Sequence, residues 1–393
     1  MADRSVVTPT RHVANSPAPK HILFVIGTLG AGGAERQMVL LIEGLVRLGM
    51  RCEVFVLDGA GPLRTRLDMM GVRVHDAGLA GASSKLTGIT TLCSAFGRLW
   101  WTALRSHPDV LQAYLPLTNF MGALVGCLAR VPVVITCRRG LGTHQDRYRW
   151  WRSCDRIANY LSHVVTANSR AVADDTIARD GIAAGKLVTI RNGLDLSSFH
   201  ATCAPEDVRR TLGLKRDEIG FVCVANLIPY KGHADLFRAL GRARGAMPPF
   251  KLFVVGRDDG IGGELGALAT GLGIGERVVF LGSRKDVGTI LRAMDVFVLA
   301  SHEEGSSNAL LEAMASGLPV VVTDVGGNRE ALQEGRFGLI VPAHDVAALS
   351  DALCAMASDL HEWRGKAAEA AKYVGDEFSA QKMVANYIAL YQR

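Results

Sequence analysis

The feature that most constrains the fold is an alternation of short apolar runs, glycine-containing turns and amphipathic helical segments. The first copy opens with HILFVI (His21–Ile26), whose β-branched and aromatic residues suit a buried parallel strand. A glycine-rich turn, GTLGAGGAE, follows, and then come a helical pattern over residues 34–48 and a second apolar run, CEVFVLD. This order predicts the βαβ start of a doubly wound parallel sheet.

The same alternation occurs on both sides of a turn-rich segment near Asn192–Pro205. Further strands are expected at Val72–His75, Val110–Ala113, Val133–Thr136 and Val164–Ala167 before it, and at Gly220–Val224, Lys251–Val255, Val278–Leu281, Val296–Leu299 and Val320–Val322 after it. At 393 residues the chain is long enough for two domains. The sequence therefore predicts an α/β protein with two Rossmann-like domains facing each other across a cleft.

Composition indicates a globular protein of the cytoplasm. Hydrophobic residues make up 49% of the chain and charged residues 21%, which excludes a disordered protein. The eight cysteines are scattered without a Cys-x-x-Cys pair, so we expect reduced, mostly buried thiols and neither a zinc site nor a disulfide framework. Residues 1–20 lack the apolar stretch of a secretory signal and are expected to form a disordered tail. Residues 110–129 are interrupted by Gln112, Pro116 and Asn119, which favours a buried strand and a core helix over a membrane span.

The most informative stretch is SHEEGSSNALLEAMASGLPVVVTDVGGNRE, residues 301–330. Ser306 or Ser307 can cap a helix, Gly317 is placed to end it in a left-handed conformation, and Pro319 prevents its continuation. The backbone N–H groups around residues 306–308 would then lie at a helix N-terminus beside two glutamates. Amides at a helix start bind anions, so the stretch predicts an anion site flanked by carboxylates.

The two glutamates of this stretch, Glu304 and Glu312, suit the binding of hydroxyl groups. A turn and a helix start separate them, so they need not act as an acid/base pair. A diphosphate needs amide donors and positive charge, whereas a ribose and a pyranose offer hydroxyls that carboxylates accept. In isolation, a capping role for Glu304 and a solvent-facing position for Glu312 would be the simpler interpretation.

Three other loops follow strand ends in the second half of the chain. Lys231, in YKGH, reaches the same side of the predicted sheet and can neutralise a diphosphate as a point charge. VVGRDDG supplies Gly256 and Arg257, and FLGSRKDV supplies Arg284 and a backbone suited to cover a nucleobase.

Taken together, these motifs resemble those of a family 4 glycosyltransferase, the retaining group of the GT-B fold related to sucrose synthases and bacterial glycan-assembly enzymes. The E-x7-E segment, with its surrounding EG and LEAMASGLPVV, is highly specific to this family, whereas the GGAE motif alone would be weak evidence for it. The other matching motifs are GGAERQ (Gly32–Gln37), TANSRAV (Thr166–Val172), RNGLD (Arg191–Asp195), YKGH (Tyr230–His233) and the terminal FSAQKMVANYIALYQR.

The resemblance implies roles for individual residues of a donor site. Glu304 would bind donor-sugar hydroxyls and Lys231 the diphosphate, which makes these two the catalytic candidates. Glu312 would bind the ribose, Gly305, Ser306, Ser307 and Asn308 would complete the donor site, and the loop at Gly32 and Gly33 would lie against donor phosphate and acceptor. The implied reaction retains the anomeric configuration, with the leaving diphosphate accepting the acceptor proton, and needs a nucleotide-diphosphate sugar but no cofactor and no metal.

The resemblance also implies a domain division. The tail would cover residues 1–20, an acceptor-side domain residues 21–197, and a nucleotide-sugar-binding domain residues 198–375. The family's final helix returns to the first domain, and residues 376–393 are expected to do so here.

Two positions depart from the family pattern. Many members carry a second diphosphate cation five positions before the lysine, where this chain has Asn226, and Arg257, Arg284 or Arg329 are the candidates to replace it. Many also carry a histidine after the strand VVIT, where this chain has Cys137 followed by Arg138 and Arg139. His144 lies nearby as a substitute, although a lone loop histidine is more often uninvolved.

The acceptor side is basic. Residues 1–200 carry 23 Lys and Arg against 14 Asp and Glu, and the remainder carries 21 against 24. The segment 138–156 holds six arginines beside Tyr148, Trp150 and Trp151, and LWW (Leu99–Trp101) lies on another expected helix. Cations and indoles together suit an anionic membrane surface and an acceptor on a lipid diphosphate at the inner face of the membrane. An ordinary helix with buried tryptophans and a solvated arginine face remains an equal alternative.

Other functions are weaker alternatives. A nucleotide-sugar epimerase can share the architecture, and a non-catalytic sugar-nucleotide sensor would bind without turnover. A dehydrogenase is disfavoured because GTLGAGGAE lacks a clean G-x-G-x-x-G. Nucleic-acid binding has only the arginine cluster behind it, so no nucleic-acid partner is expected.

Overall fold

The computed structural model describes residues 19–79, 85–196 and 204–392, with the backbone alone for residues 85–89, 144, 147 and 184. The chain forms two compact units. The first contains residues up to Asn168, Val172–Arg191 and Gln381–Arg393, and the second contains Ser169–Ala171 and Asn192–Ala380.

The first unit is built on a parallel sheet of seven strands in the order β3-β2-β1-β4-β5-β6-β7. Its strands are β1 (His21–Thr28), β2 (Arg51–Asp58), β3 (Arg73–Asp76), β4 (Val110–Tyr114), β5 (Val133–Arg138), β6 (Val164–Ala167) and β7 (Leu187–Thr189). Its helices are α1 (Gly33–Arg47), α2 (Leu63–Met69), α3 (Lys85–Ser106), α4 (Pro116–Leu128), α5 (His144–Arg147), α6 (Trp150–Leu161), α7 (Arg170–Asp180), the 3-10 turn η1 (Ala184–Lys186) and α16 (Ala380–Tyr391).

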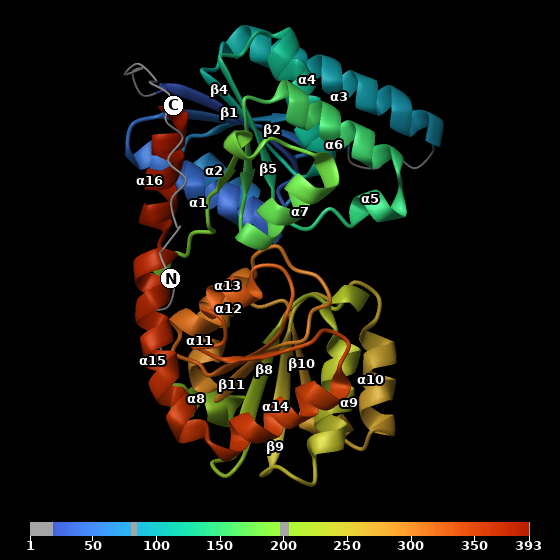
Figure 1. Cartoon of the computed structure of the whole chain (residues 1–393), viewed down its shortest axis with the longest axis vertical. Coiled ribbons are helices and arrows are strands. Elements are labelled where there is room, and N and C mark those ends of the chain that lie inside the picture. Colours follow the sequence, from blue (N-terminus) through green and yellow to red (C-terminus); the bar gives the residue numbers. More distant parts are fainter. Residues whose placement is uncertain (1–18, 80–84, 197–203, 393) are drawn as a thin grey trace. The chain divides into compact units, whose positions relative to one another are not determined.

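Alternate residues of β1 enter two separate cores. Ile22, Phe24 and Ile26 pack with α1 and α16 on one face, whereas Leu23 and Val25 pack with α3 and α4 on the other. This is the pattern of a parallel strand buried on both faces, and it explains the continuous apolar run of the sequence. Helices cover both faces of the sheet in Figure 1.

The C-terminal helix α16 belongs to the first unit and docks on α1. Tyr387 and Tyr391 are buried, and the Tyr391 hydroxyl donates to Gln112 Oε1 on β4. Gly44 of α1 allows the close approach, since a Cβ there would lie 2.4 Å from Val384 Cγ2. Packing and one buried polar contact therefore return the end of the chain to the first sheet.

The second unit contains a parallel sheet of six strands in the order β10-β9-β8-β11-β12-β13. Its strands are β8 (Ile219–Val224), β9 (Phe250–Val255), β10 (Val278–Gly282), β11 (Val296–Leu299), β12 (Val320–Thr323) and β13 (Leu339–Val341). Its helices are α8 (Pro205–Thr211), α9 (His233–Ala243), α10 (Gly262–Gly271), α11 (Val287–Ala293), α12 (Asn308–Ala315), α13 (Asn328–Ala331), α14 (Val346–Ser358) and α15 (Leu360–Glu377), with 3-10 turns η3 (Pro229–Lys231) and η4 (Gly275–Arg277).

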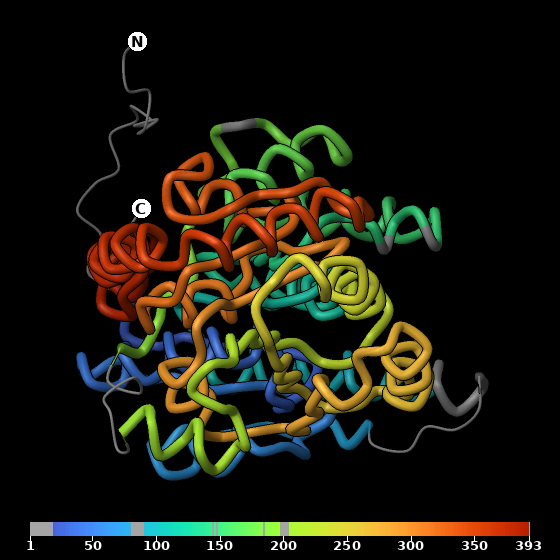
Figure 2. The backbone as a smooth tube through the Cα atoms, turned by 90° about the horizontal axis from the view of Figure 1, so that it is seen from below, coloured from blue at the N-terminus to red at the C-terminus, as the bar shows by residue number. Residues whose placement is uncertain are grey.

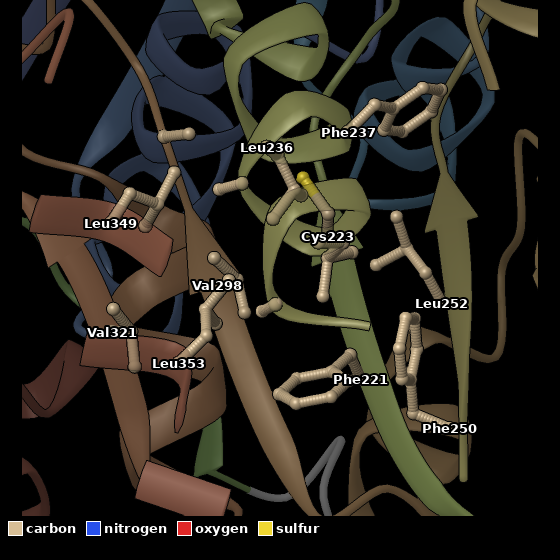
Figure 3. Close-up of a cluster of buried hydrophobic side chains, with 14 of the residues drawn as sticks. Phe221, Cys223, Leu236, Phe237, Phe250, Leu252, Val298, Val321, Leu349 and Leu353 are labelled. Atoms are coloured by element: carbon tan, nitrogen blue, oxygen red, sulfur yellow. The ribbon is translucent and has the colours of Figure 1, made fainter. Parts of the chain in front are cut away.

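One core of the second unit joins strands to helices from distant parts of the sequence. Phe221 and Cys223 of β8 meet Leu236 of α9 and Leu349 and Leu353 of α14 (Figure 3). The orange-red α14 accordingly lies beside the yellow-green α9 in both views (Figures 1 and 2). The opposite face of the sheet is covered by α11, α12 and α15.

Two Rossmann-like α/β domains are therefore confirmed, and the details differ at the sheet edges. The strands β7 and β13 were not predicted, because each is an edge strand whose apolar run is only three residues long and is too short to tell from a loop or part of a helix. Residues 110–128 form a strand and a helix as expected, and no helix in the described ranges is both long and apolar enough to span a membrane.

The chain passes from the first unit to the second at Asn192 and returns to the first at Gln381, whereas the expected boundaries were at residues 198 and 376. A backbone ladder accounts for the difference: Leu194 N donates to Phe378 O at 2.7 Å, and Ala380 N donates to Leu194 O at 3.0 Å. Burial of the thiols also differs from the expectation. Cys52, Cys137 and Cys223 are buried, but Cys93 and Cys127 are exposed.

The α1–α16 contact predicts opposite effects for two glycine-to-alanine changes. Gly44→Ala forces the new Cβ against Val384, and overpacking of this kind costs about 1–3 kcal/mol, only partly offset by the better helix propensity of alanine. Gly97 lies on α3 with nothing near its Cβ position, so Gly97→Ala should stabilise the chain by about 0.5–1 kcal/mol. Urea unfolding gives the free energy of unfolding of each variant. Equal values for the two variants would contradict the close contact between Gly44 and Val384. Val384→Ala should recover part of the loss in the Gly44→Ala background.

Candidate active site

The order of strands in the second sheet reverses between β8 and β11, and the candidate donor residues follow these two strands. In an open parallel sheet the carboxyl ends of the strands flanking such a reversal leave a crevice where ligands bind. The loop after β8 carries Asn226 and Lys231, and the loop after β11 carries Ser301 and Glu304. The topology therefore brings residues far apart in sequence to one edge of the sheet.

Lys231 and Glu304 form an ion pair at this edge. Lys231 Nζ lies 2.7 Å from Glu304 Oε1, and the Ser301 hydroxyl donates to the same oxygen at 2.8 Å. The two side chains are 18% and 9% exposed, so the pair is partly desolvated. Among the residues that the structure describes, no group donates to the other oxygen, Oε2. The carboxylate is thus held on one side and retains an acceptor on the other.

The helix α12 begins at Asn308, as the sequence predicts, with Ser307 as its cap. The Ser307 hydroxyl accepts from Leu310 N at 3.2 Å. Glu312 is buried at 3% exposure, so the solvent-facing alternative for this residue is wrong. Gly317 has φ = 72° and follows the helix as its left-handed terminator. A buried glutamate one turn into a helix beside the Lys231–Glu304 loop fits a binding role better than a surface role.

Two glycines permit the close backbone packing of this site. Gly232 has φ = 67°, and a Cβ there would lie 1.9 Å from the carbonyl oxygen of Ala300. Gly326 has φ = 53°, and its Cβ would lie 2.0 Å from Glu304 O. Gly327 N also donates to Gly305 O at 2.8 Å. Neither position accepts a side chain, which explains the Lys-Gly and Gly-Gly pairs of the motifs.

Asn226 has a structural role in the loop after β8. Its side-chain oxygen accepts from Arg257 N at 3.2 Å, and its carbonyl lies 3.0 Å from His233 Nε2. Burial lowers the pKa of His233, so the ring is neutral near pH 7 and donates through Nε2. Gly256 completes the arrangement, since a Cβ there would meet Ala225 O at 2.0 Å.

The three arginines considered as replacement cations are paired within their own loops. Arg257 Nε donates to Asp259 Oδ1 at 2.6 Å and Arg284 Nε to Asp286 Oδ1 at 2.8 Å. Arg329 Nε donates to Asp324 Oδ1 at 2.9 Å. Each guanidinium is thus already paired with a carboxylate at the protein surface.

Asp258, the neighbour of Arg257, accepts hydrogen bonds from a backbone turn. Its Oδ1 accepts from the backbone N–H groups of residues 260–262, and these hydrogen bonds hold the pKa of the carboxyl below its usual range.

Two polar residues that the sequence analysis did not assign also hold residues 305–308 of the candidate donor site. Ser169 Oγ donates to Gly305 O at 2.9 Å. Asn192 Nδ2 donates to Asn308 Oδ1 at 2.7 Å and to Ser306 O at 3.2 Å. Both lie in motifs that the sequence singles out, TANSRAV and RNGLD, but only the tertiary contacts reveal that they position residues 305–308.

In the first unit, the glycine loop follows β1 at the corresponding reversal between β1 and β4. The helix α1 begins at Gly33 with Gly32 as its N-cap, and the backbone of residues 31–33 is exposed. Glu35 folds over this loop, with Oε1 accepting from Thr28 Oγ1 at 3.2 Å. Gly61 packs closely against the start of this loop, since a Cβ added at Gly61 would lie 2.2 Å from the carbonyl oxygen of Leu29.

A cavity of about 240 Å³ lies at the carboxyl ends of β4 and β5 in the first unit. Arg138, Arg139, Asp175, Arg179 and Asp180 supply its charged walls. The remaining wall includes Leu115, Pro116, Asn119, Cys137, Gly140, Leu141, Gly142, Thr143, Gln145 and Thr176. Charges of both signs around a partly open cavity suit a polyhydroxylated ligand.

Arg138 belongs to the wall of this cavity and does not contribute to the protein surface. It is 6% exposed, and its guanidinium contacts Asp155 Oδ1 at 2.6 Å, Asn159 Oδ1 at 2.8 Å and Asp180 Oδ2 at 3.3 Å. Gln145 bridges the two aspartates. A membrane role for Arg138 is therefore excluded by burial. Its charge instead pairs with the two buried aspartates and stabilises the cavity wall.

Arg139 differs from its neighbour because its charge is not consumed by an ion pair among the described residues. Its guanidinium lies over the Tyr114 ring, 5.7 Å from the centroid. Cys137, where the family carries a histidine, is buried, and burial raises the pKa of its thiol. This thiol is protonated near neutral pH and is no proton acceptor. The side chain of His144 lies outside the described part of the chain.

The tryptophans of the basic segment begin α6. Trp150 is exposed and stacks on Trp151 with ring centroids 4.3 Å apart, while Trp151 is half-buried. The alternative of buried tryptophans is thus wrong for Trp150.

Comparison with known families identifies sequence matches in both units. Residues 31–198 match the family described as Glycosyltransferase Family 4, and residues 218–359 match the family described as Glycosyl transferases group 1. A D-inositol 3-phosphate glycosyltransferase of Kribbella flavida is 30% identical over 98% of this chain and 96% of its own length. The UDP-Gal:alpha-D-GlcNAc-diphosphoundecaprenol alpha-1,3-galactosyltransferase of Escherichia coli is 26% identical over 64% of this chain and 67% of its own length.

Among solved structures, Anabaena Alr3699/HepE in complex with UDP-glucose has the same fold. The TM-score is 0.80, with 23% sequence identity and coverage of 94% of this chain and 98% of that chain.

The geometry of the ion pair predicts the effect of Glu304→Gln. The amide keeps the size of the side chain and still accepts from Lys231 and Ser301, so we expect a loss of only about 1–2 kcal/mol in the free energy of unfolding. Sugar transfer should fall about 100-fold or more, because a preorganised charge is removed from the reacting centre. Glu276→Gln, at an exposed position on η4, is the control. Unaltered transfer by the Glu304 variant would remove it from the catalytic residues.

Proposed function

The protein belongs to glycosyltransferase family 4 and is a nucleotide-sugar-dependent enzyme of the GT-B fold, and from this premise we propose that it transfers the sugar, with retention, to a hydroxyl of a phosphate-bearing acceptor. The acceptor we favour is a lipid-linked intermediate of polysaccharide or cell-envelope assembly. The observation that carries the donor half of the proposal is the Lys231–Glu304 pair at the strand-order reversal of the second sheet. The pair presents a cation, Lys231, and a carboxylate that can accept hydrogen bonds from hydroxyl groups, Glu304. Both lie at the carboxyl ends of the strands, where an open parallel sheet binds ligands.

The donor would lie with its charges matched to these groups. Lys231 would face the diphosphate, Glu304 Oε2 the sugar hydroxyls, and Glu312 the ribose. The amides at the start of α12 would add donors for phosphate oxygens. Arg257, Arg284 and Arg329 are paired with acids near them in sequence, whereas Lys231 is paired with Glu304 at the strand-order reversal, so Lys231 would bring positive charge to the diphosphate there.

The chemistry then requires positioning and charge stabilisation. The acceptor oxygen forms a bond to the anomeric carbon from the face that the leaving group occupies, and the bond from that carbon to the diphosphate oxygen breaks. The acceptor proton passes to the departing diphosphate, whose negative charge Lys231 stabilises. No side chain acts as a general base in this scheme, which agrees with the protonated thiol at Cys137.

The cavity of the first unit supports an acceptor with an anionic group. Arg139 on its wall has no carboxylate partner in the described ranges, unlike Arg138 and Arg179. Both named relatives act on acceptors that contain phosphate, an inositol phosphate in one case and a polyprenol diphosphate sugar in the other. A second candidate acceptor is therefore a free phosphorylated cyclitol, which also offers a hydroxyl beside a phosphate. The D-inositol 3-phosphate glycosyltransferase, which aligns with nearly the whole chain, favours this candidate.

The surface of α3 and α6 supports the lipid-linked alternative. Both helices pack beside α4. The sequence of α3 has no acidic residue, and the one acid of α6, Asp155, is buried against Arg138. Trp101 and Trp150 are both 57% exposed, and Arg105 lies over the Trp101 ring at 5.0 Å. Exposed indoles among unopposed arginines suit an anionic lipid surface.

We predict that Arg139→Gln raises the KM for the acceptor about tenfold or more, because a charge-assisted contact to phosphate is worth about 1.5–3 kcal/mol. The KM for the nucleotide sugar, first selected from a panel by thermal shift, should not change. Polyprenol-diphosphate-linked sugars and inositol phosphate are tested side by side. Equal acceptor KM values for variant and wild type would contradict the assignment, and donor turnover without any acceptor would instead indicate an epimerase.

We predict that the protein sediments with vesicles containing anionic phospholipid at low salt and is released as salt rises. Trp101→Ser and Trp150→Ser should weaken this binding. The control is Met69→Ser, which removes a 78% exposed apolar side chain from α2 of the same unit. If the protein does not sediment with these vesicles at low salt, the proposal that α3 and α6 bind a membrane surface is wrong.

A further inference from the structure

Three potential metal ligands converge in the second unit, apart from the residues assigned to the donor. Asp235 lies in the first turn of α9, His302 in the loop after β11, and His344 in the loop after β13. One ligand atom from each lies within 4.8 Å of the others. His302 Nε2 is 2.8 Å from Asp235 Oδ2, and the rings of His302 and His344 have centroids 3.8 Å apart.

These distances suit a divalent transition metal. Zinc binds imidazole nitrogen and carboxylate oxygen at about 2.0–2.2 Å, so ligands on one ion lie about 3–3.5 Å apart. The Asp235–His302 separation is already close to that spacing, and the exposed His344 needs only a side-chain rotation to join them. Two imidazoles and one carboxylate favour Zn²⁺ or Co²⁺ over Mg²⁺ or Ca²⁺, which prefer oxygen ligands.

The backbone at His344 adds a second observation. Its φ is 64°, a left-handed conformation that is uncommon outside glycine. The next residue, Asp345, caps α14 by accepting from Ala348 N at 2.8 Å, which fixes the turn. The fold thus holds a histidine, at some conformational cost, where its ring meets His302.

We propose that Asp235, His302 and His344 form a binding site for one divalent transition-metal ion of the zinc type. Three protein ligands leave at least one position for water, so the ion would be held without a closed cage. The site lies beside the donor loops, because His302 N donates to Tyr230 O at 2.7 Å, next to Lys231, and His302 is close in sequence to Glu304. An ion there would tie together the two loops that carry the Lys231–Glu304 pair. Its role is structural or regulatory and does not replace the diphosphate chemistry.

The test is a titration of the untagged full-length chain with Co²⁺ and with Zn²⁺, without nucleotide. We expect one ion per chain, visible absorption from the bound Co²⁺, and displacement of Co²⁺ by Zn²⁺. His344→Asn keeps a residue that tolerates the left-handed backbone but removes the imidazole, and it should weaken binding at least tenfold. Asp235→Asn should do the same.

The matched control is His361→Asn, which removes an exposed histidine from α15 of the same unit. Wild-type affinity in this variant, together with weakened binding in the other two, would establish the site. No stoichiometric binding, or equal binding by His344→Asn and wild type, would overturn the proposal and leave an Asp235–His302 hydrogen bond beside a stacked histidine. Because the titration uses neither donor nor acceptor, its failure is distinct from failure of the proposed transfer reaction.

Discussion

Close backbone contact between loops is the constraint on which the candidate donor site depends. At Gly232 and Gly326 the chain passes so near to Ala300 O and Glu304 O that a single carbon atom would not fit. These contacts fix the loop after β8, the loop after β11 and the Gly-Gly turn after β12 relative to one another. Lys231 and Glu304 meet because the backbones that carry them are held at this distance. The glycines therefore set the geometry of the Lys231–Glu304 pair.

Polar contacts from outside the E-x7-E segment complete that arrangement. Ser169 and Asn192 bind the backbone or side chains of residues 305–308. Ser301 holds the same oxygen of Glu304 that Lys231 contacts. The Glu304 carboxylate is therefore positioned by two side chains, Lys231 and Ser301, while Ser169 and Asn192 hold the residues that follow it.

Two adjacent arginines of the first unit differ in their partners, and this separates structural charge from charge available to a ligand. Arg138 is buried and saturated by Asp155, Asn159 and Asp180, so it stabilises the cavity wall. Arg139, the next residue along the chain, points its guanidinium over Tyr114 instead. Adjacent side chains at the end of a strand point in opposite directions, so one guanidinium is held by carboxylates and the other is not, although both line the cavity.

The sequence by itself determined the class of fold and the start and end of α12, because strand and helix periodicity and glycine positions are local properties. It also singled out the candidate donor residues through their motifs. It did not determine the short edge strands β7 and β13, the exact change-over between units, or the burial of Glu312 and Arg138. Tertiary structure decided these, since burial and pairing depend on segments distant in sequence. The same holds for the assembly of Asp235, His302 and His344, which no motif links and which only the parallel sheet brings to one edge.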